Sequence, residues 1–262
     1  MTARRRTPRC RIRAHATLHQ VPTMRFLTLA VGALALGAAS PAQGQLLSTS
    51  HSGISRISLG ARAIYAQPVG EFHDYVSQAW GGEGLFSLNL DRAGVASLRV
   101  SAGFLNYGNE TKRVPLSPTL GNRIMVDLTT SNNILLLGAG PQLAVPSGPV
   151  RPYVNGSIGM SYFFTESSVE GANNNAEPFA QTTNHHDAVF AYGGGAGFLF
   201  PFSVRAQVVS LDIGAQYVNN GRATYLRKGG IIDNNDGTIT LQKNESAANF
   251  VTYHIGVAVT LK

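Results

Sequence analysis

The sequence is poor in cysteine and in charged residues. Its only cysteine, Cys10, lies close to the N-terminus, and Asp, Glu, Lys and Arg together make up 13% of the chain. An ordinary soluble domain has about a quarter of its residues charged. Downstream of residue 44 there is no thiol, which excludes disulfide bonds and cysteine-based catalysis in that part of the protein.

A helical repeat of apolar residues is also nearly absent after residue 45. In its place, stretches of about ten residues alternate between apolar and polar, which is the period of a β-strand with two different faces. Eight such stretches occur, at residues 56–66, 79–90, 95–107, 123–145, 150–165, 187–200, 207–218 and 249–261. The pattern predicts an all-β fold.

The connections between these stretches alternate in length. Three are short turns rich in Pro, Gly, Asp and Ser, at residues 91–94, 146–149 and 201–206, and the other four are long and polar. Short turns at one end and long loops at the other are typical of outer-membrane barrels. We therefore predict a closed eight-stranded antiparallel transmembrane β-barrel, built as an up-and-down meander.

Excess positive charge is confined to the N-terminal leader. The formal net charge is +7, but residues 1–44 hold seven arginines and no acidic residue, while the other 218 residues hold 14 Lys and Arg against 14 Asp and Glu. The basic character therefore belongs to the leader, and nucleic acid is not expected as a partner.

The leader has the layout of a secretory signal peptide from Met24 onward. Arg25 supplies a short basic region, residues 27–39 an apolar one, and Ala42-Gln43-Gly44 a small-x-small cleavage site. This apolar run is too short for a transmembrane helix. The preceding residues indicate a start codon assigned too early, with a long basic region or an Arg-rich transit peptide as alternatives.

These features predict four segments. They are a mis-assigned start or extended leader at 1–23, a signal peptide at 24–44, a short N-terminal segment at 45–55 and a barrel domain at 56–262. Because the barrel domain follows a secretory signal, we expect it to be exported.

Aromatic residues gather at one predicted rim. If neighbouring strands alternate in direction, the ends of odd strands and the starts of even strands meet at the long-loop end. The aromatic residues in those positions are Tyr65, Trp80, Tyr107, Tyr162, Phe164, Phe190, Tyr192, Tyr217 and Tyr253. They predict an interfacial aromatic girdle.

The face opposite the apolar residues carries a few charges in mid-strand. These residues are Arg62, Glu83, Arg99, Asp212 and His254. In a closed barrel we expect Arg62 beside Glu83, Glu83 beside Arg99, and Asp212 near His254 and Arg62. Such charges predict an ion-pair network that plugs a polar lumen, because unpaired charges there would be costly. A proton path is the alternative.

A membrane barrel and a soluble barrel differ in which face of the strands, apolar or charged, points outward. In a soluble barrel the charged face would be outside and the apolar face would form the core. The narrow interior of an eight-stranded barrel accepts small side chains better than large ones. Glycines such as Gly193, Gly195 and Gly197 share the charged face, which favours a polar lumen and a lipid-facing apolar exterior.

The last predicted strand carries a further pattern, a polar residue followed by glycine and two apolar positions. Its residues are His254, Gly256, Val259 and Leu261. The spacing resembles the C-terminal assembly signal of outer-membrane barrels. With the predicted architecture, the chain resembles the small eight-stranded OmpA/OmpX/OmpW-type barrels over most of residues 55–262. The family usually ends on an aromatic residue, whereas this chain ends on Lys262.

The resemblance implies a location and a set of partners. It implies export to the bacterial outer membrane, where the lipid bilayer and lipopolysaccharide surround the barrel. It also implies barrel-assembly machinery and periplasmic chaperones as transient partners. It implies no cofactor, and it names no ligand for the outer loops.

His185, His186 and Asp187 form the most site-like cluster. Vicinal histidines beside an aspartate are candidate ligands for a transition metal. However, adjacent side chains on a strand point to opposite faces, and no other ligand is clustered with them in sequence. A solvated start of a strand is therefore the favoured interpretation, and no catalytic or metal site is predicted.

Residues 229–242, GGIIDNNDGTITLQ, resemble a calcium loop in their spacing of Asp233, Asn235 and Gly237. The acidic ligand expected at the twelfth position is missing, because Asn244 stands there. A β-hairpin with a turn containing Asp236-Gly237 is the favoured alternative.

These observations predict a non-catalytic integral outer-membrane protein whose outer loops form the interaction surface. Passive transport of small apolar molecules is an alternative, because residues 66–76, AQPVGEFHDYV, resemble a Pro-x-Gly-x-Phe stretch of OmpW-type barrels. A lipid-modifying enzyme at the rim is another alternative. The His-x-Ser pattern of such enzymes does not occur in this sequence.

Overall fold

The computed structural model describes residues 57–115, 125–171, 178–204, 207–234 and 238–261. By its internal contacts the chain divides into Met1–Ser50 and His51–Lys262, and the described residues all belong to the second unit. The predicted leader, signal peptide and N-terminal segment lie outside the described residues, as does the predicted Asp236-Gly237 turn.

Ten strands and one short 3₁₀ helix make up the described residues. They are β1 (Ile57–Pro68), η1 (Gly70–Asp74), β2 (Ala79–Asn89), β3 (Ala96–Pro115), β4 (Met125–Ala144), β5 (Arg151–Gly171), β6 (Ala180–Val204), β7 (Gln207–Asn220), β8 (Arg222–Asp233), β9 (Ile239–Ala247) and β10 (Phe250–Leu261). Within this part of the chain, no helix has the length and apolarity needed to cross a membrane.

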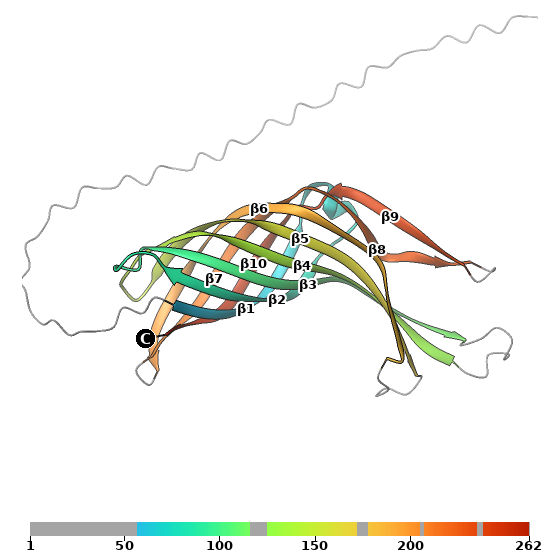
Figure 1. Ribbon diagram of the computed structural model, residues 1–262, viewed down its shortest axis with the longest axis horizontal. Coiled ribbons are helices and arrows are strands. Elements are labelled where there is room, and N and C mark those ends of the chain that lie inside the picture. Colours follow the sequence, from blue (N-terminus) through green and yellow to red (C-terminus); the bar gives the residue numbers. More distant parts are fainter. Residues whose placement is uncertain (1–56, 116–124, 172–177, 205–206, 235–237, 262) are drawn as a thin grey trace, which may run out of the picture. The chain divides into compact units, whose positions relative to one another are not determined.

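Eight of the strands close into one antiparallel barrel (Figure 1). Their order is β1-β10-β7-β6-β5-β4-β3-β2, and β8 with β9 forms a separate hairpin inserted between β7 and β10. The barrel closes between its first and last strands, where Ile57 pairs with Leu261 and Pro68 pairs with Phe250. The predicted closed eight-stranded meander is confirmed.

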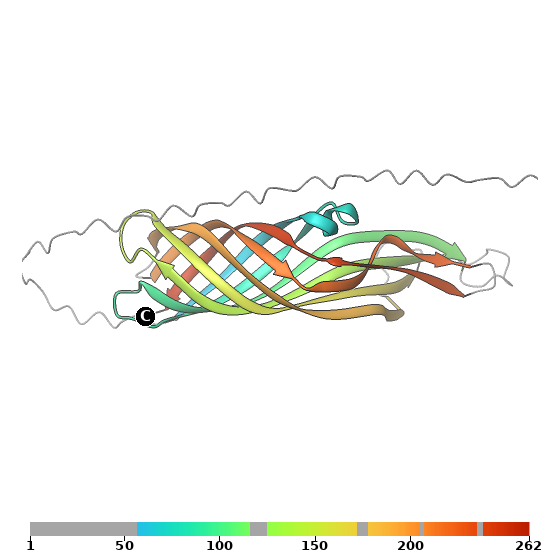
Figure 2. The same cartoon turned by 90° about the horizontal axis from the view of Figure 1, so that it is seen from above.

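The four middle strands are longer than the strands that flank them. Of the four, β3, β5 and β6 also exceed the predicted stretches, whereas β4 closely matches the predicted 123–145. β1, β2 and β10 have 12, 11 and 12 residues, close to the length of about 9–11 that crosses a membrane. By contrast, β3, β4, β5 and β6 have 20, 20, 21 and 25. Their surplus forms two hairpins that project with β8–β9 from one end of the barrel (Figure 2). We call this the hairpin end, and the opposite end the turn end.

The extensions escaped the sequence pattern because they have no apolar face. In β3 and β4, Thr111 pairs with Thr129, and their hydroxyls lie 3.0 Å apart. Backbone hydrogen bonds between the two strands continue through such polar pairs, because these bonds do not require that one face of the strands is buried. Connections that were expected to be long polar loops are therefore partly strands.

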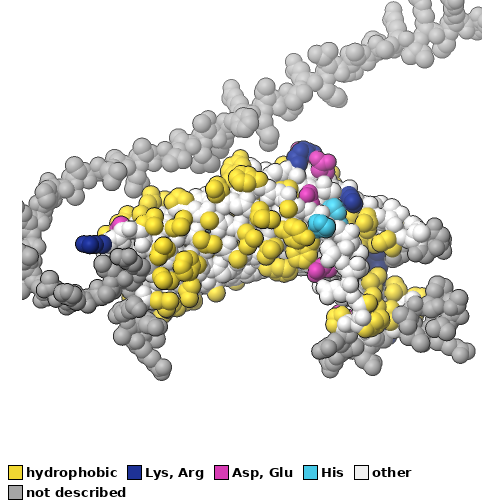
Figure 3. All heavy atoms as spheres, viewed as in Figure 1, with side chains coloured by type: hydrophobic (Ala, Val, Ile, Leu, Met, Phe, Trp, Pro, Cys, Tyr) yellow, Lys and Arg dark blue, Asp and Glu magenta, His cyan; other side chains and the backbone are white. Residues whose placement is uncertain are grey.

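Side chains are arranged on the barrel wall in the reverse of a soluble barrel. Leu59, Ile158 and Ile255 on the outside are exposed by 47%, 64% and 54%, whereas Arg62 and Asp212 inside are exposed by 6% and 4%. Figure 3 shows hydrophobic side chains covering the visible wall, with charged side chains gathered towards its ends. The outer surface of the barrel is thus apolar and its interior polar.

The turn between β2 and β3 is organised by one carboxylate. Asp91 accepts hydrogen bonds from the backbone N–H groups of Ala93, Val95 and Ala96, at 3.0, 3.2 and 2.8 Å. Gly94 completes the turn with a φ of 73°, a conformation that glycine adopts without strain. The hydrogen bond from Ala96 is the main cause that lowers the pKa of Asp91 below its usual 3.8.

We expect this turn to loosen only in strong acid. A lowered pKa means that the carboxylate stabilises the turn above its unfolded-chain pKa, and that this contribution is lost as the pH falls through the lower, folded-state pKa. The amide shift of Ala96 in an NMR titration should therefore move with a midpoint below pH 3.8. Asp91→Asn should abolish the titration, and a midpoint above that value would contradict the assignment.

Candidate functional site: a polar lumen closed by an aromatic plug

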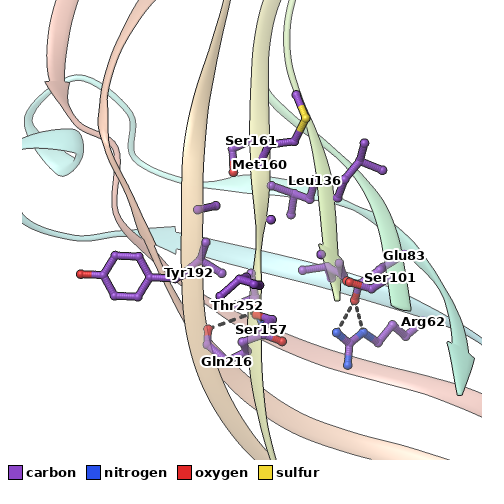
Figure 4. Close-up of a pocket in the computed structure, with 17 residues that line it drawn as sticks. Arg62, Glu83, Ser101, Leu136, Ser157, Met160, Ser161, Tyr192, Gln216 and Thr252 are labelled. Carbon is purple, nitrogen blue, oxygen red and sulfur yellow. Dashed lines mark hydrogen bonds and ion pairs between the residues drawn. The ribbon is translucent and has the colours of Figure 1, made fainter. Parts of the chain in front are cut away.

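Arg62 lies among the lumen charges with a carboxylate on each side. On the neighbouring strand Glu83 is its direct pairing partner, and the Arg62 guanidinium donates to the Glu83 carboxylate. Figure 4 shows the two side chains pointing towards one another across the wall of β1 and β2. Nη1 of Arg62 also lies 3.9 Å from Oδ2 of Asp212 on β7. One buried cation therefore joins two buried anions.

Asp212 is held by two further groups on its other oxygen. The hydroxyl of Tyr153 donates to Oδ1 over 2.7 Å, and Nε2 of His254 lies 3.5 Å from the same atom. Tyr153 and His254 are themselves 2.9 Å apart. Sequence reasoning missed Tyr153, although it shares the polar face of β5 with Asn155 and Ser157.

The position predicted for Arg99 is wrong. Arg99 was expected beside Glu83, but it pairs with Ser87 across β2 and β3, four residues nearer the turn end. Its Nη1 donates to Oε1 of Gln142 over 3.2 Å, and no carboxylate oxygen of the described residues lies within 4.0 Å of its nitrogens. The pairing register of the two strands places the Arg99 and Glu83 side chains at different depths in the barrel. Alternation along the sequence gives the face on which a side chain lies, but it does not give this register.

Glycines make room for this network. A Cβ on Gly214 would lie 2.8 Å from Nε2 of His254, and one on Gly197 would lie 2.6 Å from the hydroxyl of Tyr153. A Cβ on Gly256 would clash with Cβ of Arg62. Gly256, predicted as part of an assembly signal, therefore has a packing role of its own, while recognition of His254, Gly256, Val259 and Leu261 by assembly machinery stays a prediction.

An aromatic plug fills the lumen at the hairpin end. Phe72 of η1 lies edge-on to Tyr225, Phe163 and Tyr107, with ring centroids 5.1, 6.1 and 6.2 Å apart. We define these four side chains as the aromatic plug, and all four are buried. Burial raises the pKa of the Tyr225 hydroxyl, which pairs with the Ser246 hydroxyl over 2.7 Å. The mouth is therefore closed by side chains from four separate elements.

The assignment of Tyr107 to the outer girdle is wrong. Tyr107 points into the lumen, and its hydroxyl donates to the carbonyl of Leu226 on β8 over 3.1 Å. Tyr107 lies an even number of residues from Arg99 along β3, so strand alternation puts both side chains on the same face. This alternation could have placed Tyr107 in the lumen. The register also shifts between Asn106 and Gly108, opposite Asn132 and Asn133, so a β-bulge lies at Tyr107.

The other predicted girdle residues lie on the outer face. Trp80, Phe190, Tyr192, Tyr217 and Tyr253 are exposed. Tyr65 lies between Trp80 and Tyr253, with centroids 4.5 and 6.3 Å away, and Tyr162 contacts Phe164 at 5.5 Å. Their position at a membrane interface stays a prediction.

His185 and Asp187 hold the β8–β9 hairpin rather than forming a metal cluster. Oδ2 of Asp187 accepts the backbone N–H of Thr224 over 2.6 Å, and Nε2 of His185 donates to the carbonyl of the same residue over 2.9 Å. His186 faces the other side, where its ring lies 5.9 Å from Tyr162. Within the described residues, no three His, Cys, Asp or Glu side chains are grouped as metal ligands.

Loss of this latch should loosen the hairpin. Asp187→Ala removes the acceptor of the Thr224 N–H, and an amide left without a partner costs about 1–3 kcal/mol. We expect faster hydrogen–deuterium exchange throughout β8, measured by mass spectrometry on the refolded protein. His186→Ala is the matched control and should leave exchange in β8 unchanged. Equal exchange in the Asp187 variant and the wild type would contradict the latch.

Arg222 clamps the start of the same hairpin to η1. Its Nε lies 3.0 Å from Oε1 of Glu245, and its Nη1 lies 3.5 Å from Oε2 of Glu71. The hydrogen bond to Glu245 is the main cause that raises the pKa of Arg222. These side chains are about 60% exposed, so the clamp adds little stability and chiefly orients the hairpin.

Residues 229–242 form the predicted hairpin. Ile231 pairs with Leu241 and Asp233 pairs with Ile239 across β8 and β9. Between Leu226 and Ile231 the register shifts, which leaves Arg227, Lys228 and Gly229 bulged and exposed. Asn235 and Gly237, which gave the spacing that resembled a calcium loop, lie outside the described residues.

Comparison with known proteins finds no match to a family model and no curated protein similar in sequence. Solved structures with some similarity include Neisserial surface protein A (13% identity over 78% of this chain and 97% of that chain, TM-score 0.41). They also include Ail, the attachment invasion locus protein of Yersinia pestis (13%, 79% and 97%, TM-score 0.36). A third is a major outer membrane protein from Thermus thermophilus (13%, 78% and 99%, TM-score 0.42). Likeness at this level does not extend to what the chain binds or does.

The lumen is organised in layers from one end to the other. The aromatic plug closes the hairpin end, and below it a cavity of about 40 Å³ lies beside Arg62 and Glu83. The ion network follows, and a larger cavity of about 120 Å³ occupies the turn end. Such layers suit a rigid, closed barrel better than a wide aqueous channel.

Proposed function

We propose that this chain is an integral protein of the bacterial outer membrane. The observation that carries the proposal is the reversed polarity of the barrel, with exposed aliphatic side chains outside and buried charges inside. Lipid is the solvent that suits such an exterior, and a closed barrel leaves no strand edge unpaired within it. The lipid bilayer and lipopolysaccharide are then its surroundings, and barrel-assembly machinery and periplasmic chaperones are its transient partners after signal-directed export.

The role that the geometry supports best is non-catalytic. The aromatic plug closes the lumen at the hairpin end, so the surface available to large molecules at that end is that of the three hairpins. Two of these hairpins continue the barrel wall, and the third is fixed across the mouth by Asp187, His185 and Tyr107. We propose that the hairpins form a rigid outer interaction surface.

Cysteine accessibility tests this orientation. In a Cys10→Ser background, Lys243→Cys lies on the β8–β9 hairpin and Ser147→Cys lies in the turn between β4 and β5; both positions are exposed. A membrane-impermeant maleimide should label the first variant in intact cells and the second only after the outer membrane is opened. The reverse order would invert the topology, and a detergent-free, monodisperse soluble monomer would refute the membrane assignment.

Trimming a hairpin tests the role itself. Replacing residues 110–130 with an Asn-Gly turn should leave a barrel that still shows heat-modifiable migration on a gel. Adhesion of cells that carry this variant to host-cell or abiotic surfaces should fall relative to wild type. Unchanged adhesion on every surface would argue against the hairpins as the interaction surface.

One observation favours passive transport of small apolar molecules as a second candidate. An apolar depression on the outer wall, bordered by Leu98, Ile158 and Tyr192, shares Gly140 and Gly156 with a small pocket on the inner side. At this point Pro141 lacks the N–H that a strand ladder needs, so the hydrogen bonding of the wall is interrupted there. Uptake of a small hydrocarbon by liposomes that contain the protein tests this candidate, and rates equal to empty liposomes would exclude it.

A further inference from the structure

The lumen cavity at the turn end is lined mainly by polar side chains. It has a volume of about 120 Å³ and is bordered by residues of β1, β2, β3, β4, β5, β7 and β10. The side chains that matter for its chemistry are Ser58, Ser87, Ser97, Arg99, Gln142 and Ser210. A water molecule occupies about 30 Å³ of liquid, so the cavity has room for a small ion with part of its hydration shell.

Arg99 is a buried cation without a paired carboxylate. Its side chain borders this cavity and is 6% exposed. Its one hydrogen-bond partner among the described residues is the neutral amide of Gln142, at 3.2 Å. A guanidinium carries five N–H donors in a fixed plane, so most of its hydrogen-bonding capacity is unused. Burying a charge in this way is costly unless an opposite charge compensates it.

The two lumen carboxylates are already engaged elsewhere. Glu83 is paired with Arg62, and Asp212 is shared by Arg62, Tyr153 and His254. Asp212 also borders the cavity, but its carboxylate oxygens lie against Arg62, Tyr153 and His254. Among the described residues, the Arg99 guanidinium therefore borders the cavity without a carboxylate paired to it.

Hydroxyl groups stand beside this guanidinium. Ser87 is the direct pairing partner of Arg99 across β2 and β3, which places their Cβ atoms about 5 Å apart. Ser97 lies two residues from Arg99 on the same face of β3. Among the described residues, the hydroxyls of Ser87 and Ser210 have no hydrogen-bond partner. Guanidinium and hydroxyl donors together are the groups that bind anions in proteins.

We propose that this cavity binds a small inorganic anion, such as phosphate, sulfate or chloride. The anion forms an ion pair with Arg99 and accepts hydrogen bonds from the hydroxyls of Ser87, Ser97 and Ser210. The anion supplies the counter-charge that the described part of the chain does not place within 4 Å of Arg99. The site opens at the turn end, on the side opposite the hairpins. It is independent of any ligand of the hairpins.

Thermal unfolding of the refolded full chain in detergent tests the site. Sodium phosphate, sulfate and chloride are titrated separately, with sodium gluconate holding the ionic strength constant because gluconate is too large for the cavity. Binding to the folded state should raise the unfolding temperature along a saturable curve. At least one of the three anions should give this curve with wild type.

Arg99→Gln is the decisive variant, and Arg222→Gln is its control, with the same change of charge on an exposed side chain. Losing a charged hydrogen-bond partner should weaken the apparent affinity of the stabilising anion by at least about tenfold. The Arg222 variant should respond as wild type does. Equal responses in wild type and Arg99→Gln, or no saturable response to any anion, would overturn the proposal.

A second measurement needs no variant. Crystals of the wild-type protein soaked in sodium bromide should show an anomalous peak within hydrogen-bonding distance of the Arg99 guanidinium, and phosphate in excess should displace it. A cavity that contains only water, both in the bromide soak and in crystals soaked in phosphate or sulfate, would overturn the proposal, even if the Arg99 variant fails to fold.

Discussion

Arg62→Ala should destabilise the folded barrel by about 3–5 kcal/mol, because it leaves buried carboxylates without their cation. Glu83 loses its ion pair, and Asp212 keeps only Tyr153 and His254. The lumen would then hold two carboxylates against Arg99 alone. Of the lumen side chains described, Arg62 is the one whose truncation leaves the most uncompensated charge.

Urea unfolding in phospholipid vesicles measures this effect. The chain has one tryptophan, Trp80, which lies on the outer face of β2 and reports unfolding by its fluorescence. Arg222→Ala removes an exposed cation and should leave the free energy of unfolding close to that of wild type. An Arg62→Ala variant as stable as Arg222→Ala would show that water in the lumen screens the network.

A double variant separates pairing from packing. Arg62→Met combined with Glu83→Met removes one charge of each sign and leaves Arg99 and Asp212 in balance. Because replacing a buried pair with apolar side chains is often neutral, this variant should be more stable than Arg62→Ala alone. If it is less stable, the two side chains act mainly through their packing.

Phe72→Ala should open the aromatic plug at a cost of about 3–5 kcal/mol, the usual range for a fully buried phenylalanine. Phe72 is 1% exposed and contacts the rings of Tyr107, Phe163 and Tyr225. Tyr225 is one of the residues that hold β8 against the barrel. The cost should therefore appear as local opening of η1 and β8–β9, while the barrel wall remains closed.

Limited proteolysis detects this opening. Arg227 and Lys228 lie in the exposed bulge of β8 and are the trypsin sites closest to the plug. Cleavage there should be much faster in Phe72→Ala than in wild type, with heat-modifiable migration retained. His73→Ala, in the same segment and exposed, should be cleaved at the wild-type rate. Equal rates for Phe72→Ala and wild type would mean that the hairpin is seated without the plug.

Both predictions concern residues that the sequence located only in part. Alternation identified the strand that carries Arg62 and the face that it occupies, because the period of two is a local property of the backbone. The same argument applied to Tyr107 gives the lumen. For Tyr107, the prediction instead followed the enrichment of aromatic residues at membrane interfaces, and this placed the side chain on the wrong face.

Pairing within the lumen required the tertiary structure. Arg62 and Glu83 lie on strands that follow one another in the chain and therefore adjoin in a meander, so their proximity was predicted from the sequence. Arg99 differs because the register of β3 against β2 sets its depth, and the geometry of the connecting turn fixes that register. Alternation along the sequence gives the face of a residue but not its partner. Tyr153 completes the network from β5, across the lumen from β1.

The sequence alone determined the class of this protein: low charge, period-two alternation and alternating loop lengths require a barrel with an apolar outside. These features are local, so they can be read without knowing which residues meet. Only the closed barrel shows which side chains meet in the lumen. The plug joins Phe72 to Tyr225, more than 150 residues away along the chain, and the latch joins Asp187 to the backbone of Thr224. Such contacts depend on where the wall brings distant segments together, which no stretch of sequence specifies by itself.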